Sequence, residues 1–242
     1  MNQEAVETYL NDGLLMVFVA PVDPSLRRDV MDCSLYTQLA AARQFSKFTD
    51  YRDWQTTLIK ALAAFGWLRL DLADKQGTSG ETLAIAEVLS ELLPDALSDW
   101  RGERLDNLLA SLFQAPGNDV AAAIIERCVE VTAPQTDTRN AIQAHAEPLS
   151  SVVLQIGFVL PTREMVLLCV AFETLETVDA NPFAQRLMNS QLAGDFRAFA
   201  FVGVLDDLRY SPFRQRIDKA LAEKRAALCF PCKAFPVTAE QS

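Results

Sequence analysis

Two adjacent carboxylates are the first residues whose types and spacing suggest chemistry. Asp206 and Asp207 follow an apolar segment, and Arg209 and Tyr210 come directly behind them. Carboxylates at a strand end can bind Mg²⁺ or act as an acid–base pair. Because neighbouring residues of a strand point to opposite faces, the two carboxylates converge only if a turn begins there. We favour turn chemistry that leads into a helix, and we keep these four residues as weak candidates.

A pair of thiols near the C-terminus has the spacing of redox and metal sites. Cys229-Phe-Pro-Cys232 is similar, over these four residues, to the Cys-x-Pro-Cys motif of thioredoxin-like enzymes. In that fold the motif opens a helix after an early strand, where the helix dipole lowers the thiol pKa. Here it follows the last predicted helix, so a thioredoxin fold cannot be built around it. A zinc site would need a second Cys or His pair, which the sequence lacks. We therefore favour an ordinary pair of tail thiols and keep both as weak candidates.

Two further features are weighed against common chemistries. The segment 77–82 lies between a predicted strand and a predicted helix, where phosphate-binding loops occur, but Glu81 stands where a P-loop needs Lys. We interpret it as a capping box formed by Thr78 and Glu81. His145 is the only histidine and falls in a polar segment, which argues against histidine-based triads and excludes metal sites built on His ligands. We expect no metal and no cofactor.

The charge balance excludes several partners. The net charge is −10, and the acidic excess lies within residues 1–148. Nucleic acids and anionic membranes need clustered Lys and Arg, so we expect no nucleic-acid binding and no membrane binding at neutral pH. The N-terminus lacks a basic stretch, and the apolar run 14–20 is too short for a signal peptide or a membrane span. These features, with five scattered cysteines, predict a cytoplasmic protein.

The first half of the chain reads as mainly helical. A short polar helix is expected before the apolar run 14–20, and a longer helix over about 25–45. Tyr51, Trp54, Leu58, Leu62 and Phe65 recur at helical spacing, and Asp50 suits an N-cap. Residues 67–72 alternate as a half-buried strand does. Helices then follow up to about residue 93 and around Leu105–Phe113, with a shorter one behind them.

The second half reads as a small sheet closed by a helix. Residues 152–160 and 165–172 form nearly continuous apolar runs typical of a hairpin buried on both faces, and 196–205 predicts a third strand. A final helix is expected to begin with Ser211 as its N-cap and Pro212 at its first helical position. The sequence thus predicts an α+β fold: a helical acidic part (1–132), a linker (133–149), and a small antiparallel sheet with a C-terminal helix (150–242). These parts form either separate units or one continuous domain.

The sequence lacks the residue patterns of the catalytic sites considered above, and this absence determines the function that we expect. We expect a non-catalytic protein that works through a protein partner or as a homo-oligomer, such as an immunity-like, accessory or structural subunit. A sheet that is apolar on both faces needs cover, which either the helices or a second copy must supply. A membrane-acting toxin component, whose amphipathic helices open onto lipid, is the alternative. A carboxylate- or thiol-dependent enzyme is the third hypothesis.

Overall fold

A computed structural model describes residues 6–77, 81–114, 119–132 and 148–232. Strands and helices alternate along these residues. The strands are β1 (Glu7–Asn11), β2 (Leu14–Phe18), β3 (Trp67–Gln76), β4 (Thr82–Ala84), β5 (Val129–Thr132), β6 (Leu149–Val159), β7 (Glu164–Thr174), β8 (Arg186–Met188), β9 (Arg197–Leu205) and β10 (Cys229–Cys232). The helices are α1 (Pro24–Ala42), α2 (Tyr51–Ala64), α3 (Ile85–Leu92), α4 (Glu103–Gln114), α5 (Asp119–Cys128), α6 (Asp207–Leu221) and α7 (Arg225–Leu228), with 3₁₀ turns η1 (Asp95–Trp100) and η2 (Asn189–Gln191).

One large mixed sheet organises the described residues. Seven of its eight strands lie in the order β10-β1-β2-β6-β7-β9-β3, and the eighth, β5, pairs with the beginning of β6. The β2–β6 pair is parallel, whereas the other pairs of this sheet are antiparallel. A separate two-stranded sheet joins β4 and β8. Strands from the first fifth of the sequence and from its C-terminal end therefore lie next to one another.

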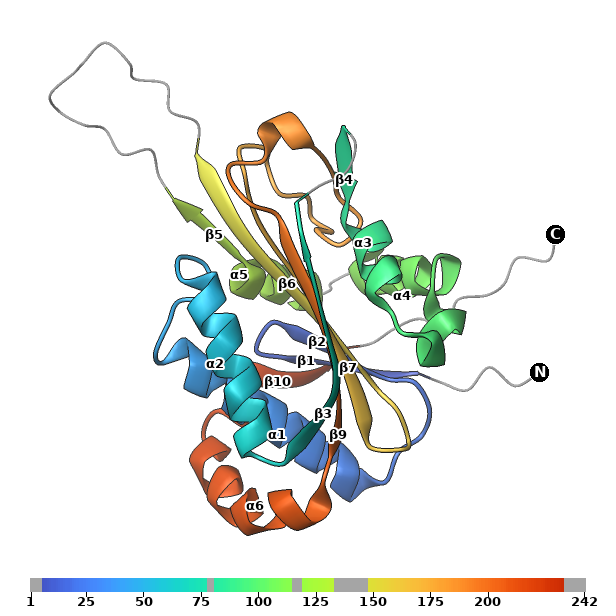
Figure 1. Cartoon of the computed structure of the whole chain (residues 1–242), viewed down its shortest axis with the longest axis vertical. Coiled ribbons are helices and arrows are strands. Elements are labelled where there is room, and N and C mark those ends of the chain that lie inside the picture. Colours follow the sequence, from blue (N-terminus) through green and yellow to red (C-terminus); the bar gives the residue numbers. More distant parts are fainter. Residues whose placement is uncertain (1–5, 78–80, 115–118, 133–147, 233–242) are drawn as a thin grey trace, which may run out of the picture.

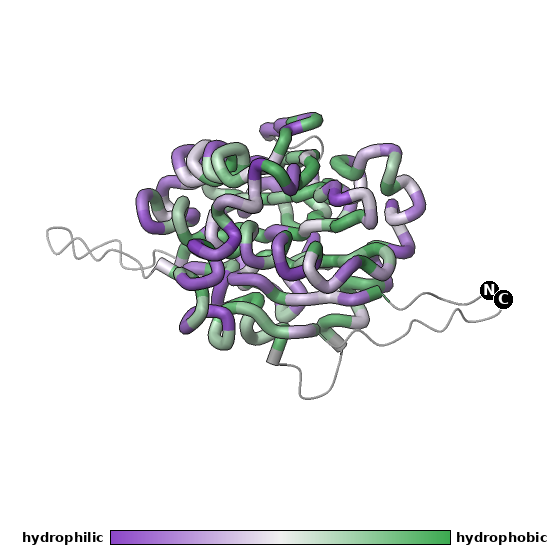
Figure 2. Tube along the Cα trace, turned by 90° about the horizontal axis from the view of Figure 1, so that it is seen from below, coloured by the Kyte–Doolittle hydropathy of each residue, from purple (hydrophilic) through white to green (hydrophobic). Residues whose placement is uncertain are grey.

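Helices cover both faces of this sheet (Figure 1). Helices α1, α2 and α6 pack on one face, and α3, η1, α4 and α5 pack on the other. Hydrophobic segments concentrate in the interior between these layers, and hydrophilic ones lie mainly outside (Figure 2). The predicted small antiparallel sheet closed by a C-terminal helix is wrong, because the sheet is large and mixed and the helical layers enclose it.

The first strands form a hairpin instead of the expected polar helix. Strand β1 pairs with β2 around Asp12 and Gly13, which both have positive φ, at 52° and 86°. Two successive residues of this kind are what a type I′ hairpin turn requires, and Asp-Gly is a favoured pair for it. The hairpin places β1 between β2 and β10, so both ends of the described chain are held in the sheet.

The predicted apolar hairpin is present at the centre of the sheet. Strand β6 pairs with β7 in antiparallel register from Ser150↔Thr174 to Val159↔Met165. Nearly every residue of both strands is buried, because their alternate side chains enter the two helix-covered cores. Because helices cover both faces of these strands, successive residues are all buried, and the strands appear in the sequence as continuous apolar runs.

Candidate functional site

The two C-terminal thiols lie on opposite faces of the sheet. Cys229 faces the α1 layer and donates to Asn11 Oδ1 at 2.8 Å, whereas Cys232 belongs to the core under α3 and α4. Residues three apart in a strand span about 10 Å, beyond the reach of a disulfide. Burial is the main cause that raises the pKa of each thiol to about 12. Both thiols therefore stay protonated at neutral pH, and the structure does not bring them together.

The two adjacent carboxylates diverge at the start of α6. Asp206 is the N-cap of the helix, and its Oδ1 accepts from the backbone N–H of Leu208 at 2.9 Å and of Arg209 at 3.3 Å. Asp207 instead contacts Arg214 at 2.7 Å. The N-cap of the helix thus lies five residues before the predicted N-cap Ser211, which is within the helix. Helix capping accounts for the Asp206 carboxylate, and an ion pair accounts for the Asp207 carboxylate.

The other two weak candidates occupy contrasting environments. The Arg209 side chain is largely exposed and approaches Asp206 at 3.6 Å. Tyr210 is buried against Gly66, and its hydroxyl has no hydrogen-bond partner among the described residues. Burial is the largest cause that raises the pKa of the Tyr210 hydroxyl.

Two sequence features fall largely outside the described residues. His145 is outside them, and so are residues 78–80, which include Thr78 of the predicted capping box. The N-cap position of α3 is held by Ala84, which makes no side-chain cap hydrogen bond. That helix therefore begins directly after β4 and is not capped by Thr78.

Buried ion pairs join α1 to the C-terminal helices, and sequence reasoning missed them. Asp29 receives two hydrogen bonds from Arg214, at 2.8 and 2.7 Å. Asp32 receives two from Arg225, both at 2.7 Å. The two carboxylate residues are less than a tenth exposed. Asp29 and Asp32 are three positions apart on one helix face, which is the signal that could have indicated a shared partner surface. This helical layer is therefore held by polar bonds as well as by apolar packing.

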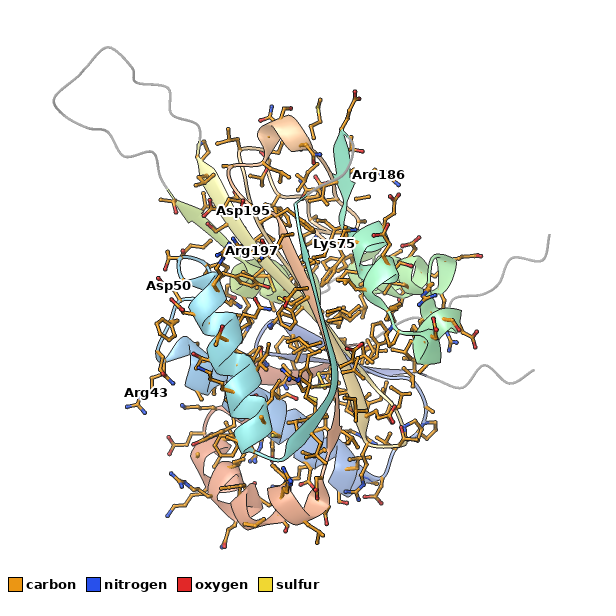
Figure 3. The ribbon with its side chains drawn as sticks, in the orientation of Figure 1. Arg43, Asp50, Lys75, Arg186, Asp195 and Arg197 are labelled. Carbon is orange, nitrogen blue, oxygen red and sulfur yellow. The ribbon has the colours of Figure 1, made fainter. Side chains whose placement is uncertain are left out.

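The opposite layer is held differently. Its inward residues are apolar, and Trp100 of η1 packs on Phe158 of β6 with ring centroids 5.3 Å apart. Arg127 of α5 pairs with Asp12 at 3.0 Å, whereas α3 is joined to strands by two more exposed ion pairs, from Glu91 to Lys75 of β3 and from Glu87 to Arg186 of β8. Lys75 and Arg186 lie on the α3 side of the molecule (Figure 3). Because these two pairs of α3 are solvent-exposed, each contributes only about 0–1 kcal/mol.

A cleft also opens within this layer. It has a volume of about 560 Å³ and lies between α3, α4 and residues 181–186. Glu87, Glu91, Asp106 and Arg186 contribute charged groups to its wall, and Leu109 contributes an apolar one. The cleft admits water between the two helices and their neighbouring loop. The α3–α4 layer is thus interrupted by a cleft lined by charged groups.

The described residues contain no group of three or more His, Cys, Asp or Glu side chains placed to hold a metal ion. No helix within that part of the chain combines the length and apolar character needed to cross a membrane.

No family model matches this chain, and no curated protein sequence does. Solved structures resemble it at low identity. The Evf virulence factor is 10% identical over 88% of this chain and 82% of its own, with a TM-score of 0.43. The activated Cyt2Ba monomer from Bacillus thuringiensis subsp. israelensis is 14% identical over 79% and 97%, with a TM-score of 0.42. A delta-endotoxin is 15% identical over 79% and 81%, with a TM-score of 0.38.

Proposed function

We propose that this protein acts on lipid membranes by moving the α3–α4 layer aside and presenting the apolar sheet beneath it. The supporting observation is the inequality of the two helical covers. Bidentate ion pairs between the buried carboxylates of α1 and partly exposed arginines tie α1 to α6 and α7. The α3–α4 layer relies on apolar contacts and exposed ion pairs.

The apolar contacts explain why lipid would favour this movement. In water, separating the layer exposes apolar surface at a cost of roughly 25 cal/mol per Å². Next to lipid tails this cost falls away, because the tails are as apolar as the buried side chains. The inner stripes of α3 and α4, which include Leu89, Leu105, Leu109 and Leu112, could lie on the same surface.

Charge determines which lipids suit this proposal. The chain carries −10, so anionic lipid at neutral pH repels it. We therefore expect activity on zwitterionic vesicles, and on anionic ones once acid has reduced the net negative charge of the chain.

Tryptophan fluorescence can test which layer moves. A chain that keeps only Trp100 (Trp54→Phe, Trp67→Phe) reports on the α3–α4 layer, where Trp100 packs on the sheet. Vesicles of zwitterionic lipid with brominated tails should quench this tryptophan, and vesicles loaded with dye should leak. The matched control keeps only Trp54, which is buried in the α1–α2 layer.

The two single-tryptophan chains distinguish release of one layer from general unfolding and from no action on lipid. Quenching of Trp100 without quenching of Trp54 supports release of the α3–α4 layer. Equal quenching of both would mean general unfolding on lipid. An absence of dye leakage at both neutral and acid pH, with neither tryptophan quenched, would contradict membrane action altogether.

A further inference from the structure

Strand β3 forms one edge of the large sheet, since it pairs with β9 and ends the strand order (Figure 1). From Asp71 to Gln76 most of its residues are exposed, including Ala73 and Asp74. A bulge at Leu70 interrupts the register just before this run, and beyond it the pairing with β9 is regular. The regular run is therefore an open backbone edge about six residues long.

The hydrogen bonds to β9 show which backbone groups this edge presents. Gly77 N–H donates to Phe196 C=O, so alternation along an antiparallel ladder turns residues 75, 73 and 71 toward β9 as well. Leu72, Asp74 and Gln76 then turn their N–H and C=O groups outward. The hydrogen bond of Leu72 fits this alternation, because its N–H donates to the Asp71 carboxylate at 2.8 Å instead of to β9.

The side chains alternate between the two faces of the strand. Lys75 pairs with Glu91 of α3, so Asp71, Ala73 and Lys75 point to the α3 side. Asp74 accepts from Gln55 of α2 and therefore points to the other side. On the α3 side the order is thus an acidic residue, a small residue and a basic residue, spaced two apart.

This order is self-complementary. If a second copy lies antiparallel with Ala73 on the two-fold axis, Asp71 of each copy stands opposite Lys75 of the other. Leu72 and Asp74 then face each other with their outward backbone groups, which are the groups that form ladder bonds. Ala73 occupies a non-hydrogen-bonded position, where the strands approach to about 4.5 Å between Cα atoms and a small side chain fits best.

We propose that two copies of this chain pair along β3 and continue the sheet across the dimer. The occupant is a second copy because the charges match only in this self-paired register. The contact is short, so association is weak and depends on protein concentration. On pairing, the Leu72 N–H stops donating to the Asp71 carboxylate and donates instead to a backbone carbonyl of the second copy. The Asp71 carboxylate is then free to pair with Lys75 of the second copy. This proposal is independent of the membrane proposal, since it is made and tested without lipid.

Sedimentation over a concentration series tests the pairing. The parent chain should shift toward twice its mass as concentration rises. Asp71→Lys and Lys75→Asp each place like charges opposite one another twice, so each should raise the dissociation constant about tenfold. The double variant Asp71→Lys/Lys75→Asp restores opposite charges and should dimerise again.

Controls separate this contact from net charge and from misfolding. Asp53→Lys makes the same charge change on exposed α2 and should leave the dissociation constant close to that of the parent. Asp74→Pro removes an outward N–H while sparing the ladder to β9, and should leave a folded monomer. A parent chain that stays monomeric at every concentration overturns the proposal. So does a folded double variant that fails to regain the association lost in the single variants.

Discussion

Asp32 of α1 and Arg225 of α7 form a bidentate ion pair across 193 positions of sequence, with both hydrogen bonds at 2.7 Å. The pair joins the beginning and the end of the chain on one side of the sheet. Asp32→Ala should lower the free energy of unfolding by about 2–4 kcal/mol, because it leaves a partly buried guanidinium without its carboxylate. Glu87→Ala, which breaks the exposed pair with Arg186, should cost at most about 1 kcal/mol. Urea denaturation of both variants checks the difference, and equal losses would contradict it.

The same side of the molecule should weaken in acid. Hydrogen bonds from Arg28 and then Arg225 lower the pKa of Asp218 below its ordinary value of 3.8. A carboxyl group with a lowered pKa stabilises the fold above that ordinary value, and the contribution is lost as pH falls through the folded pKa. The parent chain should therefore be more stable than Asp218→Asn at neutral pH, and the gap should narrow below about pH 3.8. Urea midpoints at several pH values measure this, and a constant gap would refute it.

The thiols of β10 should be inert in the folded protein. The pKa of Cys229 and of Cys232 is about 12 because both are buried, and thiolates are the reactive species. Alkylation at neutral pH, followed by mass spectrometry, should be slow for the native chain and fast in urea. A mild oxidant should not join the two thiols within one folded chain. Recovery of an intrachain Cys229–Cys232 disulfide from folded protein would contradict the placement of the thiols on opposite faces.

The inner stripe of α4 should contribute strongly to stability. Leu109 is 2% exposed in the core between α4 and the sheet. Leu109→Ala should therefore cost about 2–5 kcal/mol of unfolding free energy through lost burial and a residual cavity. Leu208, which is 85% exposed, is the matched control, and Leu208→Ala should change stability by about 0.5 kcal/mol or less. Thermal melts followed by circular dichroism would show whether the two leucines differ.

The start of α6 provides a test of capping. Asp206→Ala removes the carboxylate that accepts from two backbone N–H groups and should cost about 1 kcal/mol. Ser211→Ala lies within the helix and should cost much less. If Ser211→Ala proves the more damaging change, the helix starts where sequence reasoning placed it.

The sequence by itself determined elements whose pattern is local. The 3-4-4-3 spacing from Tyr51 to Phe65 predicted α2, and the apolar runs on either side of residues 161–164 predicted the β6–β7 hairpin. Such patterns are readable because helix and strand periods act over a few residues. The Asp12-Gly13 turn was also present in the sequence, and recognising it would have replaced the expected polar helix with β1.

Only the tertiary structure decided how these elements combine. The parallel pairing of β2 with β6 and the place of β10 beside β1 join segments far apart in sequence, and no local period encodes such contacts. The same holds for the arginine partners of the buried Asp29 and Asp32, which lie on α6 and α7. Strand alternation places Cys229 and Cys232 on opposite faces, but only once the segment is known to be a strand. The size of the sheet was therefore underestimated, because its outer strands are short and pair with segments far away in the sequence.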